Sequence, residues 1–265
     1  MRRINKIYIL IVLLFFIIFV STNAGATVRV EPARIIINSL SRSRSTGTIE
    51  VVNKGEEAVE LTAVLNDWSL DEKDALLFFE AGKSNYSLAG LIKFNPRSFI
   101  LQPGKKQIVR FTINTPENPE KERRGVVFFE HETDFTDAQT GSKIITQIGT
   151  VIYLVPADIK YNFKFTGLRI YKIPPPEPQP VVLSVENAGT GHFRYYLSYR
   201  VVDSENRLVM EEKFNEEFII LPEYKRKITF MLAERLKPGD YKLMLQFSFY
   251  NTDKTADYQI PITIN

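Results

Sequence analysis

The segment Phe94–Glu130 constrains the fold of this chain most strongly, because its side chains alternate as they do in paired β-strands. Pro103 and Gly104 form a turn signal within it, since proline presets one φ angle and glycine accepts a positive one. Polar and apolar side chains then alternate over residues 107–113, and an apolar run follows at Val126–Phe129. This order of strand, tight turn, strand, polar loop and strand predicts an antiparallel β-sandwich rather than an enzyme pocket.

A weak internal repeat predicts the number of domains. Thr48–Gly55 is an alternating strand that ends in an Asn-x-Gly turn, and Val182–Gly189 has the same pattern. Pro238–Tyr241 has the form of the turn and tyrosine corner that enter a late sandwich strand. No long stretch shows 3.6-residue periodicity. We therefore predict an all-β chain with two tandem immunoglobulin-like β-sandwich domains, at residues 27–157 and 160–265.

The proline-rich run Ile173–Pro180 has the composition of a stiff linker between domains. The repeat favours another position, because the run falls where the first domain has its Leu40–Thr46 connection. We therefore predict a rigid loop between the first two strands of the second domain.

The N-terminal residues predict export. Three basic residues within Met1–Lys6 precede an uninterrupted apolar run, Ile7–Val20, and Ala24–Ala26 has the small-residue pattern of a cleavage site. A helix of this run spans roughly 21 Å, which is short of a hydrocarbon core of roughly 30 Å. We predict a cleaved signal peptide at residues 1–26, and a retained N-terminal anchor is the alternative.

Composition excludes several kinds of chemistry. The chain has no cysteine, so an exported form has neither disulfides nor thiol chemistry. Its net charge of +3 includes three basic residues of the predicted signal peptide, so the mature chain is nearly neutral. A nucleic-acid partner is therefore not expected, because such a partner normally requires a basic surface.

The sequence contains no recognisable catalytic or cofactor-binding motif. His131 and His192 are its only histidines, and neither has the spacing of a metal ligand. Trp68 ends an alternating strand, where a tryptophan of the sandwich core is expected. We predict a protein that is not an enzyme and that uses no cofactor, metal or small-molecule substrate.

The segment Phe94–Glu130 also resembles the N-terminal domain of the PapD-like periplasmic chaperones that assemble pili. In that family a similar L-x-P-G-x-x-x-x-V-R strand precedes a loop and an R-x-x-x-F-x strand. The resemblance covers one domain. It implies a periplasmic chaperone whose partners are pilin or fimbrial-type protein subunits, with an outer-membrane usher as a further partner where the cell has an outer membrane. In a cell without an outer membrane the exported protein would be extracellular.

The resemblance assigns a role to an arginine of the N-terminal strand Val28–Ile37. Family members carry an arginine just before an apolar triplet, and it binds the subunit's terminal carboxylate in the cleft between the domains. Arg34 matches it by position. Guanidinium suits this role because it holds a carboxylate with two parallel hydrogen bonds. The alternative is a strand arginine that only extends its charge to water.

The resemblance also implies that Lys143–Val155 is an edge strand that is donated to a subunit. Backbone hydrogen bonds would pair the two edges, and apolar side chains would fill the subunit's groove. Ile144, Ile148 and Ile152 share one face and are the candidate donor residues. The alternative is an ordinary strand of the chain's own sandwich. The sequence departs from the family at Val151, where family members have a lysine that helps to hold the carboxylate.

These features together predict a periplasmic chaperone for pilus or fimbria-like subunits that binds its clients by donating an edge strand. The alternative from another class is a structural or adhesive secreted protein with tandem sandwich domains as spacers. A carbohydrate-binding module is a third possibility. It would require a row of exposed aromatic side chains.

Overall fold

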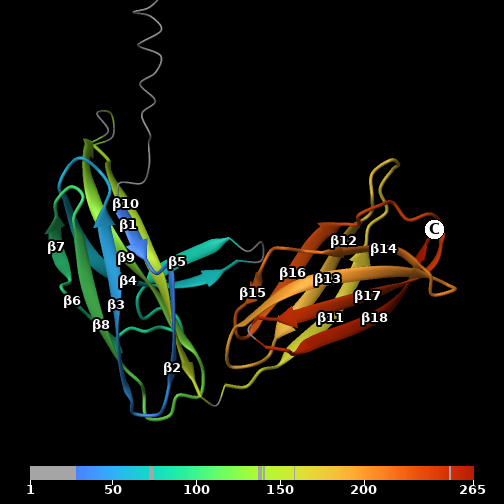
Figure 1. Ribbon diagram of the computed structural model, residues 1–265, viewed down its shortest axis with the longest axis horizontal. Helices are drawn as coiled ribbons and strands as arrows, with labels where there is room; N and C mark the ends of the chain where they lie inside the picture. Colours follow the sequence, from blue (N-terminus) through green and yellow to red (C-terminus); the bar gives the residue numbers. More distant parts are fainter. Residues whose placement is uncertain (1–27, 72–74, 137–138, 140, 158, 251) are drawn as a thin grey trace, which may run out of the picture.

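The computed structural model describes residues 28–265 apart from 72–74, 137–138, 140, 158 and 251. It shows two β-sandwich domains joined end to end and set at a wide angle (Figure 1). The described residues form strands and turns, and none of them belongs to a helix that could span a membrane. The all-β, two-domain prediction is confirmed. The predicted signal peptide, residues 1–26, lies outside the described residues.

Two packed sheets build the first domain from strands β1 to β10. Within the described residues these are β1 (Val28–Glu31), β2 (Arg34–Ser39), β3 (Arg44–Asn53), β4 (Val59–Leu70), β5 (Leu76–Glu80), β6 (Ile92–Asn95), β7 (Ser98–Leu101), β8 (Lys106–Asn114), β9 (Arg123–Thr136) and β10 (Lys143–Pro156). One sheet has the order β1-β3-β8-β6. The other has the order β2-β10-β9-β4-β5, and β7 also pairs with β4.

The second domain is built in the same way from strands β11 to β18. Within the described residues these are β11 (Phe163–Ile170), β12 (Pro180–Asn187), β13 (Phe193–Asp203), β14 (Leu208–Lys213), β15 (Phe218–Ile220), β16 (Tyr224–Met231), β17 (Gly239–Phe249) and β18 (Thr255–Ile264). One sheet has the order β11-β12-β16 and the other β14-β13-β17-β18, with β15 paired to β13. The strict alternation of buried residues along β13 shows why these strands form: one face fills the core.

The chain switches sheets near its start, which corrects the expectation of one N-terminal strand over Val28–Ile37. β1 pairs antiparallel with β3 in one sheet, whereas β2 pairs parallel with β10 in the other. Pro32 lies between them and has no backbone N–H to donate to a ladder. The switch places Arg34 at the first position of β2.

The internal repeat corresponds to a shared turn in the two domains. Asn53 and Asn187 are both fully buried, and their side chains make equivalent sets of three hydrogen bonds. The Nδ2 atom of Asn53 donates to the carbonyl oxygens of Glu57 (2.7 Å) and Leu101 (2.9 Å), and its Oδ1 accepts from the N–H of Gly55 (2.9 Å). The corresponding bonds of Asn187 reach Gly191 (2.7 Å), Ile220 (3.2 Å) and Gly189 (2.9 Å).

Two further features of the second domain were expected from the sequence. The proline-rich run lies between β11 and β12, which pair with each other, so it is a loop within the domain and not an interdomain linker. The hydroxyl of Tyr241 donates to the carbonyl oxygen of Lys237 (3.1 Å), which is the backward hydrogen bond of a tyrosine corner.

Candidate functional site

Strand β10 has two halves that differ in their neighbours. Over Val151–Leu154 it is paired with both β9 and the parallel strand β2, and Val155 and Pro156 continue beside β2. Over residues 145–149 the described part of the chain supplies only β9. The N–H of Val151 donates to the carbonyl oxygen of Ala33 (3.0 Å), so it points toward β2. Because backbone groups alternate along a strand, Ile145, Gln147 and Gly149 direct their N–H and C=O groups toward the same open edge.

The three predicted donor residues fall in different environments. Ile144 is 51% exposed, and Ile148 is half-buried against the first-domain core. Ile152 is fully buried within that core. Its side chain therefore cannot fill a partner's groove, and we remove it from the donor set. The reason is that β2 covers the half of β10 that contains it. The donor role of Ile144 and Ile148 stays a prediction.

Arg34 lies where the open half of β10 ends. Its partner in the parallel register is Val151, so the residue beside it is neutral where the family resemblance calls for a lysine. The Arg34 side chain is 40% exposed, and its Nη1 lies 3.8 Å from Oε1 of Glu217 in the second domain. An arginine of the first domain thus lies next to a carboxylate of the second domain, where the two domains meet.

A second arginine holds the same carboxylate. Arg194, near the start of β13, donates from Nε to Oε1 of Glu217 (2.7 Å), and its Nη2 contacts both carboxylate oxygens. The Arg194 side chain is 8% exposed and lies 4.1 Å from the ring centroid of Tyr250. Sequence reasoning missed Arg194 and Glu217, because Arg34 and this pair lie far apart in the chain.

A buried charged cluster also joins the domains. Glu122 is fully buried and accepts hydrogen bonds from the backbone N–H (3.0 Å) and the ring Nδ1 (2.5 Å) of His192. Arg124 lies beside it, with Nη1 3.6 Å from the carboxylate, and burial lowers the pKa of this guanidinium. His192 also packs against the ring of Tyr153 at 4.4 Å between centroids, and burial raises the pKa of this phenol. The cluster fixes the contact between the domains.

An apolar cluster completes the interface and corrects the prediction for Trp68. This tryptophan is buried, but it packs between the domains and not inside the first sandwich. Its position on β4 alternates with the residues that face the core, so its side chain points outward. The hydroxyl of Tyr224 reaches across to the Ser69 hydroxyl (2.9 Å) and to the carbonyl oxygen of Leu70. The buried members are Trp68, Leu70, Val126, Phe128, Tyr153, Val155 and Leu221.

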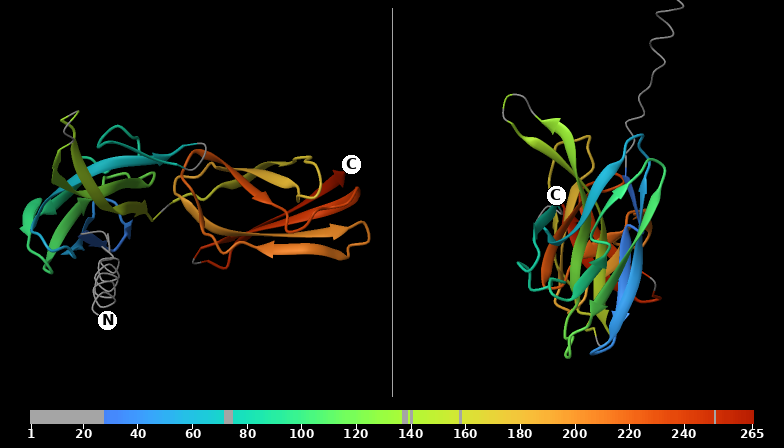
Figure 2. Two further views of the ribbon diagram at one scale, coloured as in Figure 1. Left: turned by 90° about the horizontal axis from the view of Figure 1, so that it is seen from above. Right: turned by 90° about the vertical axis from the view of Figure 1, so that its left-hand side faces the viewer.

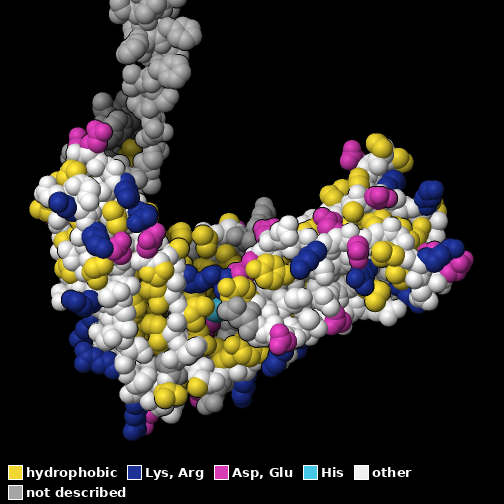
Figure 3. All heavy atoms as spheres, in the orientation of Figure 1, with side chains coloured by type: hydrophobic (Ala, Val, Ile, Leu, Met, Phe, Trp, Pro, Cys, Tyr) yellow, Lys and Arg dark blue, Asp and Glu magenta, His cyan; other side chains and the backbone are white. Residues whose placement is uncertain are grey.

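The angle between the domains has an apolar surface on the first-domain side. Figure 3 shows hydrophobic side chains gathered there, next to basic and acidic side chains of the domain junction. The hairpin of β4 and β5 reaches toward the second domain in two views (Figures 1 and 2). On β5, Leu76 and Phe78 are 58% and 47% exposed, and Phe78 packs edge-on against Phe128. The concave side of the molecule therefore combines apolar surface with the arginine pair.

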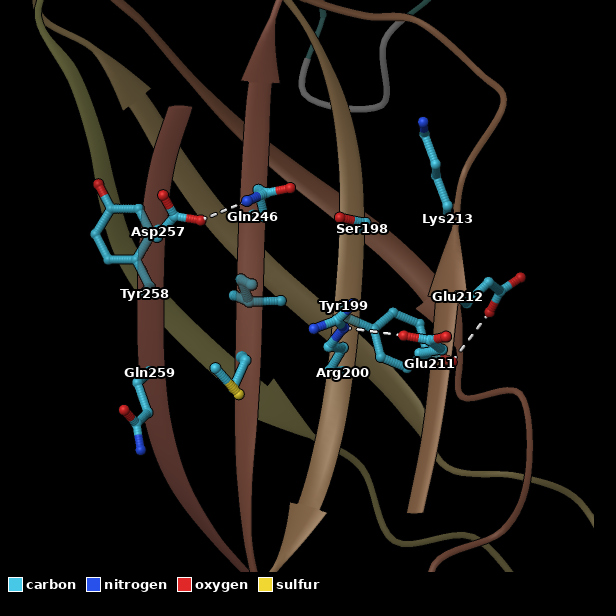
Figure 4. A pocket seen from close by; sticks show the side chains of 12 residues that line it. Ser198, Tyr199, Arg200, Glu211, Glu212, Lys213, Gln246, Asp257, Tyr258 and Gln259 are labelled. Carbon is cyan, nitrogen blue, oxygen red and sulfur yellow. Dashed lines mark hydrogen bonds and ion pairs between the residues drawn. The ribbon is translucent and has the colours of Figure 1, made fainter. Parts of the chain in front are cut away.

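A further hollow lies on the outer sheet of the second domain. Figure 4 shows it lined by polar side chains of β13, β14, β17 and β18, including an exposed ion pair between Arg200 and Glu211 (2.9 Å). Gln246 donates to Asp257 (2.9 Å) across the same face. The described residues contain no group of three or more His, Asp or Glu side chains placed to hold a metal ion. This hollow is the solvated concave face of a twisted sheet.

Solved structures of fimbrial chaperones have the same architecture. A chain from a chaperone–tip adhesin complex of CFA/I fimbriae biogenesis aligns over 89% of this chain and 98% of its own length, with 14% identity and a TM-score of 0.50. The class 5 fimbriae chaperone CfaA aligns over 90% and 100%, with 14% identity and a TM-score of 0.48. A chain from the CsuC–CsuE chaperone–tip adhesion subunit complex of Acinetobacter baumannii aligns over 88% and 98%, with 12% identity and a TM-score of 0.47.

No protein-family model and no curated protein sequence matches the chain. The structural likeness at low identity is a likeness of fold. The chain has the two-domain β-sandwich fold of the PapD-like fimbrial chaperones.

Proposed function

We propose that this protein is a periplasmic chaperone for pilus or fimbria-like subunits. It binds a subunit by pairing a strand of that subunit with the open half of β10, and it holds the subunit's terminal carboxylate at Arg34. The observation that carries the proposal is that the open edge over residues 145–149 ends at Arg34, the first residue of β2.

The proposal requires a particular direction of the client strand. β2 runs parallel to β10 and begins opposite Val151. A client strand beside residues 145–149 would lie on the same edge of β10 as β2, and it would end where β2 begins. If the client's C-terminus meets Arg34, its strand must run in the same direction as β10. Strand addition of this kind obtains affinity from main-chain hydrogen bonds and specificity from alternate side chains.

The terminal carboxylate supplies the second contact. Arg34 is partly exposed, and within the described residues its guanidinium makes no hydrogen bond and has only the 3.8 Å ion pair with Glu217. Its five N–H donors are therefore available to a carboxylate, which guanidinium binds in a planar, two-bond geometry. Because Val151 is neutral, Arg34 carries the role that the family resemblance gives to an arginine and a lysine.

The apolar side chains of the open half supply the third contact. Ile144 and Ile148 lie on the face of β10 that continues the first-domain core. A subunit that lacks a strand exposes a groove to water, and filling that groove with such side chains removes apolar surface from both proteins. No cofactor and no covalent chemistry are required.

The proposed compartment follows from the predicted signal peptide, residues 1–26. An outer-membrane usher would receive the subunit from the complex. The alternative is a secreted protein whose two domains act as a spacer, and it predicts that no subunit is bound.

The test is co-purification of the mature protein with the subunits encoded beside it. We expect wild type to capture a subunit and Arg34→Ala to lose more than tenfold in affinity, because truncating a desolvated charged hydrogen-bond partner costs roughly 2–5 kcal/mol. Arg200→Ala is the matched control, since Arg200 is an exposed strand arginine on the outer face of the second domain. If wild type captures no subunit, the spacer alternative replaces the proposal. If Arg34→Ala binds a subunit as well as wild type does, Arg34 is not the anchor of the terminal carboxylate and that part of the proposal fails.

A further inference from the structure

The carboxylate site at Arg34 already faces a carboxylate of the chain itself. Glu217 lies immediately before β15 in the second domain, is 26% exposed, and approaches Arg34 to 3.8 Å. A side-chain carboxylate and a terminal carboxylate present the same two oxygens to a guanidinium. Glu217 therefore has the chemistry of the ligand that Arg34 is proposed to bind.

Glu217 is held unequally by its two arginines. Arg194 contacts both carboxylate oxygens and donates from Nε at 2.7 Å, whereas Arg34 reaches one oxygen at a distance longer than a hydrogen bond. The Arg194 guanidinium is itself positioned by the Tyr250 ring at 4.1 Å. Arg194 thus keeps Glu217 near Arg34 while preventing a close pair between them.

We propose that Glu217 is an internal competitor for the client's terminal carboxylate at Arg34, and that Arg194 sets how strongly it competes. This inference rests on the proposed chaperone function. In the client-free protein Glu217 partly neutralises Arg34. On binding, the client carboxylate takes the free donors of Arg34, and Glu217 remains paired with Arg194.

The proposal predicts opposite effects for the two partners of one ion pair. Glu217→Gln removes the competitor, so client affinity should rise about two- to fivefold, the range for a partly exposed ion pair. Arg194→Met releases Glu217 toward Arg34, so affinity should fall by a similar factor. The double variant Arg194→Met/Glu217→Gln has no competitor to release, so it should bind at least as tightly as wild type.

The experiment measures subunit affinity by titration calorimetry for wild type, both single variants and the double variant. Glu211→Gln is the matched control, because it removes the carboxylate of the ion pair between Arg200 and Glu211 on the outer face of the same domain. This control should bind as wild type does. If Glu217→Gln binds no tighter than the control, or the double variant is as weak as Arg194→Met, the competition is refuted while the chaperone proposal stands.

A second readout does not depend on a client. Acetate serves as a minimal carboxylate, and the Nε–Hε resonance of Arg34 is followed by NMR in sodium acetate against sodium chloride of equal ionic strength. We expect a larger acetate-dependent shift in Glu217→Gln than in wild type. That result in a protein that captures no subunit would show that Glu217 competes with a carboxylate at Arg34, and it would reject the chaperone function. An equal shift in both proteins would overturn the competition.

Discussion

The two halves of β10 come from one continuous strand but have different neighbours. Over Val151–Pro156 the strand is paired with β2, and up to Leu154 it is also paired with β9, so most of its side chains are buried in the core or the domain interface. Over residues 145–149, β9 is its single neighbouring strand among the residues that the structure describes, and its side chains are exposed or half-buried. Both halves contain isoleucines on the same face, so composition does not explain the difference.

The difference arises from another part of the chain. Pro32 separates β1 from β2, and β2 then covers the second half of β10 and stops short of the first. An uncovered apolar edge invites aggregation unless a partner or a protective feature covers it. The covered half therefore serves the stability of this protein, and the open half is the part that the proposed function assigns to a client.

The largest expected effect tests the covered half. Ile152→Ala should lower the free energy of unfolding by about 2–5 kcal/mol, because it leaves a cavity in the core. Ile144→Ala removes the same atoms from an exposed position on the same face, so it should lower the free energy of unfolding far less. Urea unfolding can be followed by fluorescence of Trp68, the single tryptophan of the chain. Equal losses of unfolding free energy for the two variants would show that the covered and open halves of β10 do not differ in burial.

The second prediction concerns a structural requirement within the open half. A Cβ at Gly149 would lie 2.7 Å from the carbonyl oxygen of Val127 and 2.8 Å from the Phe128 ring. Gly149→Ala should therefore cost about 1–3 kcal/mol in stability, as overpacking does. Gly167→Ala is the matched control, since its Cβ would meet only the Ser184 Cβ, at 4.0 Å. Thermal unfolding of both variants checks this, and an unchanged melting temperature for Gly149→Ala would contradict it.

The sequence was sufficient for features whose contacts are local. Asn53 and Asn187 bond to atoms two and four residues ahead, so the Asn-x-Gly pattern already contains most of each turn. Val109, Phe111 and Ile113 are buried as their alternation predicts. Such patterns gave the fold class and the repeat, because strand period and turn chemistry are properties of a few adjacent residues.

The site depends on contacts that no local pattern contains. Glu122 meets His192 across 70 residues, and the Arg34 to Glu217 contact joins different domains. Alternation alone also cannot tell which face of a strand meets a second domain, which is why Trp68 was assigned to the wrong cluster. Pro32 was the one signal that sequence reasoning could have used, since its missing N–H marks the point where the first strand changes sheets.

The smallest expected change in the free energy of unfolding comes from substitutions at two adjacent residues. These substitutions also test most directly whether the open half of β10 binds a client. Ile144 and Ile145 are 51% and 57% exposed, and they point to opposite faces of β10 where the open half begins. Each becomes aspartate in a separate variant. Because both side chains are largely exposed, neither substitution should change the unfolding transition by more than about 1 kcal/mol.

Their effects on binding should differ. If the client's groove receives the face that continues the first-domain core, Ile144→Asp places a charge in that groove and should weaken binding at least tenfold, since burying one isoleucine side chain contributes about 1.5–3 kcal/mol. Ile145→Asp should have a smaller effect, because its side chain points away from the groove. Subunit affinity measured by calorimetry distinguishes the two. Equal weakening would mean that the client covers both faces, and no weakening by Ile144→Asp would mean that the open half is not the strand that is donated.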